Sequence, residues 1–279
     1  MSAKPNPRIA YQGVPGAFSE MAAKQFAPDA EAVGFRTFSD AFMAATSGEF
    51  THVCLPVENS LAGSINQSYD LLRDSVLHVV SEQIVRVRHN LLARKGVRLE
   101  DVKRVYSHPQ ALEQCAGFLA RHGLEGVVDF DTAGAAKLLS ENGANDRAAI
   151  ASLGAAEHYD LDVLATDIED LDFNYTRFFV LGPEEAEFAA GPRKSSLILA
   201  TKHRPGDLVE CLQQFPEHGV NMTKLESRPR RDKPWSYLFY IDIEGDISEP
   251  NVAAALTGIM RRAAMLKFLG SYPAAEVQL

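Results

Sequence analysis

The stretch Asn174-Tyr175-Thr176-Arg177-Phe178-Phe179-Val180-Leu181 is the starting point for interpreting this chain. Its second half sets aromatic and aliphatic residues side by side, which is typical of a buried strand. Its first half carries an amide, a hydroxyl and a guanidinium. Open α/β sheets bind ligands at strand ends, so this strand could present three polar groups to a ligand. Taken alone, the stretch is explained more simply by an ordinary strand residue at Thr176 and a surface ion pair at Arg177.

The composition is that of a globular protein with one or two domains. The chain has 279 residues, of which 46% are hydrophobic and 23% charged. Its net charge of −9 argues against nucleic-acid binding and requires any anion site to be local. The odd number of widely spaced cysteines, Cys54, Cys115 and Cys211, suits buried thiols in a reducing compartment. Without an apolar N-terminal run or a membrane-length apolar window, we expect a cytoplasmic protein with no membrane contact.

Strands, turns and helices alternate through residue 181, which favours an α/β fold. The predicted strands are Arg8–Gln12, Val33–Phe38, His52–Val57, Leu77–Val80, Ile84–Leu92, Val102–Tyr106, Gly126–Phe130 and Arg147–Ala151. The predicted helices are 18–26, one that begins at Asp40, Ile65–Arg73, one that begins at Pro109, Ala133–Glu141 and Leu153–Tyr159. Ser39 is the predicted cap of the second helix and Thr132 that of the fifth. Met21 is expected on the apolar side of the first helix and Met43 on that of the second. The acidic segment Thr166–Phe173 is expected to be an exposed loop.

The pattern changes after Gly182–Lys194, which is rich in Glu, Pro, Ala and Gly and is interpreted as a linker. The order of predicted elements then becomes βαββαβ, the ferredoxin-like motif. These elements are the strand Ser195–Thr201, the helix Gly206–Phe215, the strands Val220–Arg228 and Trp235–Ile243, the helix Asn251–Leu266 and the strand Phe268–Tyr272.

Four predicted strand ends lead into helix starts through small or polar residues. They are Gly13–Gly16, Glu58–Ser64, Ser107–Pro109 and Ala151–Leu153. Helix N-termini carry free N–H groups and partial positive charge, so several converging on one cleft would bind an anion. Simple capping and turn chemistry is the alternative at each turn. His108 is interpreted either as a general acid or as a structural residue at a helix start, and Glu58 either as a base or as an orienting group.

Together these stretches resemble prephenate dehydratase. The first-domain motifs are Tyr11–Ser19, Leu55–Ser60, Tyr106–Leu112, Gln114-Cys115 and Asn174–Phe178, with Thr176-Arg177-Phe178 as the family hallmark. The second domain resembles an ACT regulatory domain through Glu226–Pro229. No chorismate mutase domain is seen before Arg8, so the resemblance is to the single-activity form.

The resemblance implies a catalytic domain at 8–190 with two α/β lobes like those of periplasmic binding proteins. One lobe is expected at 8–83 plus 176–190 and the other at 84–175. It implies an ACT domain at 195–279. The implied enzyme is a carbon–oxygen lyase of L-phenylalanine biosynthesis that converts prephenate to phenylpyruvate, without an organic cofactor or metal, by loss of CO2 and water.

Residue roles follow from the same resemblance. Thr176 is expected nearest the leaving hydroxyl, in a cleft whose other catalytic residues are Glu58, Asn59 and Ser60. Arg177 is expected to hold a substrate carboxylate or to brace the site. The remaining substrate-binding candidates are Asn174, Ser107, His108, Gly13 and Phe178, the last expected to pack beneath the site.

The resemblance also implies regulation by L-phenylalanine, bound between paired ACT domains of a homodimer or homotetramer. The expected effector residues are Gly206, Asp207, Leu208, Glu226, Ser227, Arg228 and Pro229. Asp207 departs from the family's usual Ala, and its carboxylate would repel the ligand's carboxylate or pair with its ammonium. Two alternatives stay open: an arogenate dehydratase, and a non-catalytic two-lobed small-molecule sensor, which fold alone permits.

Overall fold

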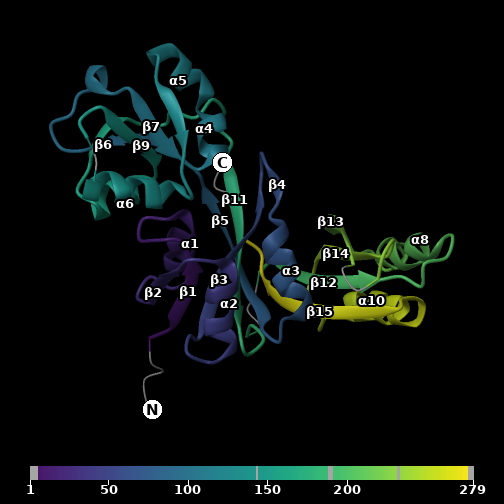
Figure 1. The fold of residues 1–279 in the computed structure, drawn as a ribbon. Helices are drawn as coiled ribbons and strands as arrows, with labels where there is room; N and C mark the ends of the chain where they lie inside the picture. Colours follow the sequence, from purple (N-terminus) through teal and green to yellow (C-terminus); the bar gives the residue numbers. More distant parts are fainter. Residues whose placement is uncertain (1–5, 143, 188–190, 231–232, 276–279) are drawn as a thin grey trace. The chain divides into compact units, whose positions relative to one another are not determined.

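The computed structural model describes residues 6–142, 144–187, 191–230 and 233–275 (Figure 1). These residues form three sheets, with strand orders β2-β1-β3-β11-β5 (and β4 on β3), β10-β6-β9-β7-β8 and β13-β14-β12-β15. Compact packing groups the chain into two units, 1–68 with 83–178 and 69–82 with 179–279. The helix α3 and the strands β5 and β11 continue from one unit into the other. The predicted α/β class followed by a ferredoxin-like motif is confirmed.

The first sheet is built around buried parallel strands. β1 pairs in parallel with both β2 and β3, and the side chains of Ile9, Val53 and Leu55 are fully buried. Such continuous apolar runs are expected of strands covered on both faces. The helices α1 and α2 pack against these strands. The elements are β1 (Arg8–Gln12), α1 (Phe18–Phe26), β2 (Glu31–Phe35), α2 (Phe38–Thr46), β3 (His52–Asn59), β4 (Gly63–Ser64), α3 (Asn66–Asp74), β5 (His78–Arg86) and β11 (Tyr175–Gly182).

The second sheet mixes parallel and antiparallel pairs. β7 is parallel to β8 and β9, whereas β6 is antiparallel to β9 and β10. Helix α6 runs along this sheet beside β9 (Figure 1). The elements are β6 (Asn90–Ala93), a 3-10 turn η1 (Leu99–Asp101), β7 (Arg104–Ser107), α4 (Pro109–Gln114), α5 (Ala116–His122), β8 (Glu125–Val128), α6 (Thr132–Asn142), β9 (Arg147–Ala151), α7 (Leu153–His158) and β10 (Asp162–Ala165).

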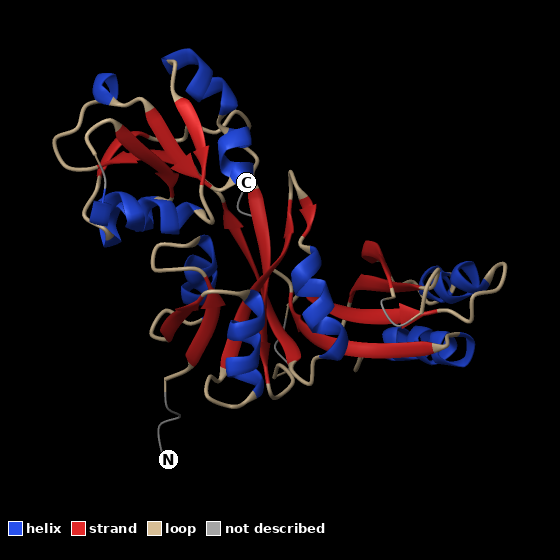
Figure 2. Cartoon of the chain, viewed as in Figure 1, coloured by secondary structure: helices blue, strands red, loops and turns tan. Residues whose placement is uncertain are grey.

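The third sheet is antiparallel throughout and has the predicted βαββαβ order. Its two long neighbours β12 and β15 run side by side (Figure 2). Leu197, Leu199 and Ile241 point from one face of this sheet into a core closed by Phe215 and Leu256 of its helices. The elements are β12 (Arg193–Ala200), α8 (Asp207–Leu212), α9 (Gln214–Glu217), β13 (Met222–Pro229), β14 (Tyr237–Glu244), α10 (Pro250–Arg262) and β15 (Met265–Pro273). The middle of the expected linker, residues 188–190, lies outside the described residues.

Several predicted elements are wrong in their bounds. The strands expected at Leu77–Val80 and Ile84–Leu92 are replaced by β5 and β6, because Ser81 and Glu82 do not break β5 but are buried within it. Glu82 is tolerated there because its carboxylate accepts a hydrogen bond from Lys194 Nζ at 2.9 Å. The helix expected at Gly206–Phe215 divides into α8 and α9, because Pro216 has no N–H to continue the ladder.

The predicted helix caps are also corrected. Thr37, not Ser39, caps α2, since its hydroxyl accepts from the Asp40 N–H at 3.1 Å. Asp131, not Thr132, caps α6 by accepting from the Gly134 N–H. The capping oxygen lies two residues earlier than predicted in α2 and one residue earlier in α6, and in each case it accepts the N–H three residues on, as an N-cap does.

Two exposure predictions fail. Met43, expected on the apolar side of α2, is exposed, and Met21 of α1 is 38% exposed. Trp235, the predicted first residue of a strand, instead precedes β14 with a positive φ of 62° and is exposed. The acidic segment Thr166–Phe173 is a loop and is largely exposed, as predicted, but Ile168 within it is buried and its N–H donates to the His89 carbonyl at 2.9 Å. A second backbone bond, from the Asp170 N–H to the Gln114 carbonyl at 2.7 Å, also holds this segment.

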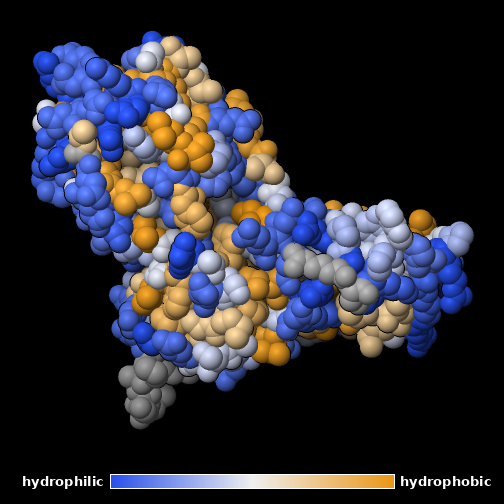
Figure 3. Space-filling model, in the orientation of Figure 1, coloured by the Kyte–Doolittle hydropathy of each residue, from blue (hydrophilic) through white to orange (hydrophobic). Residues whose placement is uncertain are grey.

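No helix among the described residues has the length and apolarity needed to cross a bilayer. On the face drawn in Figure 3, hydrophilic residues predominate and apolar residues form small separate patches. That distribution is ordinary for a chain in which 23% of the residues are charged.

Candidate functional site

Asn59, the last residue of β3, holds that strand end against the start of β11. Its Oδ1 accepts hydrogen bonds from the backbone N–H groups of Leu61 at 3.1 Å and Ala62 at 3.0 Å. Backbone N–H groups can only donate, so these two contacts fix which end of the amide is oxygen. Its Nδ2 then donates to Asn174 Oδ1 at 2.7 Å and to Thr176 Oγ1 at 3.0 Å. The side chain is only 7% exposed, so these bonds form away from water.

The orientation of Asn59 propagates through the neighbouring amides. Because Asn174 Oδ1 faces Asn59, its Nδ2 faces the other way and donates to Gln114 Oε1 at 2.9 Å. The same Gln114 oxygen lies 2.8 Å from His89 Nε2. An oxygen can only accept, so His89 Nε2 must carry a hydrogen. Backbone groups near the end of β3 thus determine the tautomer of a histidine that precedes β6.

Thr176 receives a hydrogen bond in this network and keeps its own hydrogen. Its Oγ1 accepts from Asn59, so the O–H is available to a group in the cavity that Thr176 lines. Successive side chains of a strand point to opposite faces. Thr176 and Asn59 therefore share one face of the sheet, and Arg177 and Glu58 share the other.

The cavity beside Thr176 has a volume of about 350 Å³ and is enclosed largely by the starts of helices. Its lining includes Phe18 at the start of α1, Ile65 before α3, Gln110 in the first turn of α4 and Thr132 at the start of α6. Helix N-termini favour negative charge and present free N–H groups. Among the described residues that line the cavity, none is an arginine or lysine. The arrangement can therefore bind an anion through dipoles without a cationic side chain.

This geometry answers the prediction that four helix starts converge on an anion site. The starts of α1, α3 and α4 do border one cavity. The start of α7 does not, because Ser152 Oγ donates to the Gly16 carbonyl at 2.6 Å while capping its own helix. The start of α6 borders the cavity instead, and its capping residue Asp131 adds one carboxylate to the lining.

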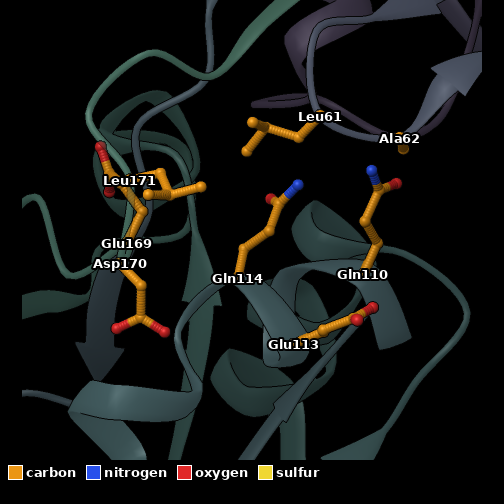
Figure 4. Close-up of a pocket in the computed structure, with 8 residues that line it drawn as sticks. All are labelled: Leu61, Ala62, Gln110, Glu113, Gln114, Glu169, Asp170 and Leu171. Atoms are coloured by element: carbon orange, nitrogen blue, oxygen red, sulfur yellow. The ribbon is translucent and has the colours of Figure 1, made fainter.

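A second cavity of about 350 Å³ adjoins the first and shares Ala62, Gln110 and Gln114 with it (Figure 4). Figure 4 shows the Gln114 amide projecting from α4 toward Leu61, with Leu171 to its left and Gln110 to its right in this view. Glutamine side chains thus stand between the two cavities, and the donor end of Gln114 is directed into this shared space.

Glu58 and Arg177 form a separate pair behind the network. The Arg177 guanidinium lies 3.9 Å from the Glu58 carboxylate, and their side chains are 12% and 35% exposed. Neither residue is among those that line the cavity beside Thr176. Of the two expected roles for Arg177, the geometry favours the brace over the carboxylate partner, and it favours an orienting role for Glu58.

Two of the expected serines serve the backbone. Ser60 Oγ accepts from the Tyr175 N–H and donates to the Phe173 carbonyl, both at 2.9 Å, which ties the start of β11 to the end of β3. Ser107 was expected to contribute its hydroxyl to the cleft. Instead it is fully buried and donates to the Ile150 carbonyl at 2.7 Å, because β7 and β9 run side by side there.

His108 lines the cavity and caps α4, since its Nδ1 accepts from the Gln110 N–H at 3.2 Å. The two remaining candidates are Gly13, expected to bind substrate, and Phe178, expected to pack beneath the site, and neither is among the residues that line the cavity beside Thr176. Gly13 is buried with a positive φ of 123°, and its N–H donates to Phe35 at 2.8 Å, so this turn packs on β2. Phe178 is 1% exposed in the core of β11.

The sequence interpretation missed His89 and gave no role to Gln110 and Gln114, although the last two lie in quoted motifs. His89 falls inside a predicted strand, where a single histidine carries no signal. Its only sequence cue is that His89-Asn90 directly precedes the apolar run Leu91-Leu92-Ala93.

The expected effector residues all lie in the second unit, on β13 and at the start of α8. Gly206 has a φ of 89°, in the left-handed region that glycine adopts readily. Asp207 Oδ2 accepts from the Arg204 N–H at 2.8 Å, which gives the unexpected carboxylate a local structural partner. Arg228 lies on β13 with its guanidinium 3.5 Å from Asp70 of α3.

Comparison with known proteins agrees with this architecture. The family model for prephenate dehydratase matches residues 9–186. The chain is 43% identical to arogenate dehydratase/prephenate dehydratase 2 of Arabidopsis thaliana, over 95% of this chain and 72% of that protein. It resembles the structure of prephenate dehydratase from Arthrobacter aurescens in complex with L-Phe, with 33% identity and a TM-score of 0.88 over 96% of this chain and 90% of that one.

A solved structure described as GqqA, a novel type of quorum-quenching acylase, is also similar, with 36% identity and a TM-score of 0.89 over 96% of this chain and 98% of that one. The family match covers the residues that build the amide network, from Asn59 to Thr176. On its fold, its site and these similarities, the chain belongs to the prephenate dehydratase family.

Proposed function

We propose that this protein removes CO2 and water from prephenate to give phenylpyruvate, as a step of L-phenylalanine biosynthesis. The observation that carries the proposal is the buried Asn59 amide, which donates to Thr176 Oγ1 at 3.0 Å and so leaves the threonine hydrogen for a ligand. Departure of the substrate's ring hydroxyl needs a donor at the leaving oxygen. Thr176 supplies that donor from a cavity of suitable volume for a small molecule.

The donor is neutral, so it acts by hydrogen bonding and not by full proton transfer. A threonine hydroxyl is a poor acid, but a fixed donor binds more strongly as negative charge grows on the leaving oxygen. Asn59 increases this effect, because a hydroxyl that accepts a hydrogen bond becomes a better donor through cooperativity. Gln114, which lines the same cavity, offers a second donor.

The substrate's two carboxylates are bound in this proposal by helix starts. The starts of α1, α3 and α4 border the cavity and attract negative charge, whereas the start of α6 already carries the carboxylate of its cap, Asp131. A dipole holds a carboxylate less tightly than an arginine does. That suits the ring carboxylate, which must lose its charge as CO2, and which a tight cationic clamp would stabilise in the ground state.

Arogenate is the second candidate substrate, and the Arabidopsis relative carries both names. Arogenate differs from prephenate by an amino group in place of a keto group, and the chemistry at the ring is the same. Measuring kcat/KM for both substrates with the purified chain decides between them.

The test of the proposed reaction is the appearance of phenylpyruvate absorbance when prephenate is added. We expect Thr176→Ala to lower kcat by about 10²-fold or more with a smaller change in KM, and Thr176→Ser to retain much of the rate. Thr257→Ala is a matched control, because Thr257 on α10 bonds only within its own helix in the contacts described. A non-catalytic sensor would bind prephenate without forming product, and would contradict the proposal.

Acylase chemistry is not proposed here, although a similar structure is described in those words. The cavity hydroxyl of Thr176 accepts from an amide and is not paired with a base, which acyl transfer by a hydroxyl would require. Burial also raises the pKa of the Cys54 and Cys115 thiols, so neither is an activated nucleophile.

We further propose that residues 8–190 form the catalytic domain, with lobes 8–83 plus 176–190 and 84–175, and that 195–279 form an ACT domain that binds phenylalanine between two copies of the chain. Support comes from the βαββαβ order and from the L-Phe complex of the Arthrobacter aurescens relative. The test is activity against phenylalanine concentration in the intact chain and in Ser227→Ala, with molecular mass measured by light scattering. Saturating phenylalanine that neither binds nor changes the rate would contradict the regulatory part alone.

A further inference from the structure

His89 is a buried histidine on the wall of the cavity that the proposed reaction leaves without a role. Its side chain is 2% exposed and lines the cavity beside Thr176. The ring packs edge-on against Phe18 of α1, with centroids 6.3 Å apart. On the side of α4, Nε2 lies 2.8 Å from Gln114 Oε1. The imidazole therefore touches the amide network at the end opposite to Asn59.

The network leaves only one chemical form of this ring. Gln114 presents oxygen to His89, so Nε2 carries the hydrogen and Nδ1 carries a lone pair. Nδ1 is buried and has no hydrogen-bond partner among the described residues. Protonation would create a charged, buried N–H without an acceptor, so the surroundings hold the ring neutral. Burial accordingly lowers the pKa of His89, and the nearby Glu169 carboxylate offsets this only in part.

The groups around the ring can be named element by element. Helix α1 contributes the uncharged Phe18 ring and α4 the uncharged Gln114 amide. The segment before β11 contributes Glu169, whose carboxylate accepts from the His89 backbone N–H at 2.9 Å. Glu169 thus binds the peptide of His89, and the ring nitrogens meet only neutral partners in the contacts described.

We propose that His89 is a positioning residue that fixes the Gln114 amide and thereby aims its NH2 group at the substrate. Two donors, His89 Nε2 and Asn174 Nδ2, converge on Gln114 Oε1. If the amide flipped, its NH2 would face the Asn174 donor, and His89 could accept from it only by moving its hydrogen to the buried Nδ1, which has no acceptor among the described residues. Both costs oppose that orientation. The NH2 group then points into the space shared by the two cavities (Figure 4). This inference rests on the proposed function for the identity of the substrate. The neutral His89 imidazole with its hydrogen on Nε2 does not depend on that function.

The experiment replaces the imidazole by a side chain that keeps the donor and by one that loses it. His89→Gln places an amide N–H near the position of Nε2 and cannot titrate. His89→Met has similar length and no donor. We expect His89→Gln to keep kcat within about 3-fold of the native value and His89→Met to lower kcat by about 10- to 10²-fold with little change in KM, the pattern of a lost transition-state contact.

Two further measurements separate positioning from packing. His52 is a second partly buried histidine, on β3, so His52→Met controls for replacing a histidine as such and is expected to leave kcat unchanged. Long-range 1H–15N spectra of the intact protein report the tautomer directly. We expect His89 to show hydrogen on Nε2 and a neutral ring at pH 7, whether or not the protein turns over prephenate.

Native kcat in His89→Met would overturn the inference, and so would equal losses in the Gln and Met variants, which would point to packing. A ring with hydrogen on Nδ1 would overturn it even if a variant failed to fold. Failure of the proposed function looks different: the native protein would form neither phenylpyruvate nor phenylalanine, while the spectra would still identify the tautomer.

Discussion

Replacing Asn59 by aspartate should invert the hydrogen bond that aims Thr176. An aspartate oxygen can still accept from the N–H groups of Leu61 and Ala62, so the turn after β3 keeps two of its bonds. The other oxygen replaces the Nδ2 donor and faces Asn174 Oδ1 at 2.7 Å and Thr176 Oγ1 at 3.0 Å. The threonine would then donate its hydrogen to the new carboxylate and have none for the substrate.

The size of the effect follows from what is lost. At least one buried acceptor, Asn174 Oδ1, is left facing another acceptor, which costs about 1–3 kcal/mol. Burying the carboxylate adds to this cost, and its two backbone donors offset part of it. We therefore expect the free energy of unfolding to fall by about 2–4 kcal/mol. Loss of a fixed donor to the leaving oxygen should lower kcat by about 10²- to 10³-fold.

The assay pairs urea unfolding with phenylpyruvate formation, and Asn90→Asp is the matched control. Asn90 is equally buried, and its Nδ2 donates to the Ala151 carbonyl at 3.2 Å, outside the network that reaches Thr176. We expect a comparable loss of stability in the control with near-native kcat in the folded protein. If folded Asn59→Asp retained kcat within about 3-fold of native, the argument that Asn59 directs the Thr176 hydroxyl would be refuted.

Three further predictions concern stability. Gly16→Ala should lower Tm by more than Gly48→Ala. Both glycines have a positive φ, but a Cβ at Gly16 would lie 2.5 Å from Ala155 Cα, whereas Gly48 faces open space. Equal shifts in Tm would argue against tight packing around Gly16. Burial lowers the pKa of His52 and His89 from 6.5 in the folded protein, so below that pH the unfolded chain binds more protons than the folded one. The free energy of unfolding from these residues should therefore be full above pH 6.5 and fall as the pH decreases below it. Urea unfolding at several pH values measures this, and a flat profile would contradict it. Lys267→Met should lower the free energy of unfolding, measured in urea, by about 1–3 kcal/mol. The Lys267 Nζ donates at 2.7 Å to the carbonyls of Arg73 and Ser75 at the end of α3, and Met cannot replace these bonds. Lys137→Met, at an exposed position, is the control and should change the free energy of unfolding little.

The parts of the fold that sequence patterns predict best are those where burial and periodicity agree. β1 and β9 have their predicted bounds, because each is a short apolar run closed by a turn. The pattern fails at β5, where Glu82 is buried by its bond to Lys194, more than 100 residues later in the chain. A long-range partner of this kind leaves no local signal, so a polar residue inside a strand is mistaken for its end.

The site shows a similar division. The motifs identify Asn59 and Thr176, and strand alternation alone already implies that Arg177 points away from Thr176. Sequence does not show that Ser107 bonds the Ile150 carbonyl, or that His89 meets Gln114, because both contacts depend on how separate elements pack. Helix starts were recognisable singly, but which of them converge could only be seen from the fold.

The absence of lysine and arginine from the described cavity lining has a chemical reason. Loss of CO2 moves negative charge from the ring carboxylate into the ring while charge also grows on the departing oxygen. A lysine or arginine beside the carboxylate would oppose the first movement, because it binds the charge best before the reaction begins. Helix starts bind that carboxylate more weakly than a cation does. The hydroxyl of Thr176, oriented by Asn59, donates to the departing oxygen, on which negative charge grows during the reaction. The donors are fixed before substrate enters, so little reorganisation is needed during the reaction. An amide network anchored on two backbone N–H groups achieves this fixation without a cationic side chain in the cavity lining.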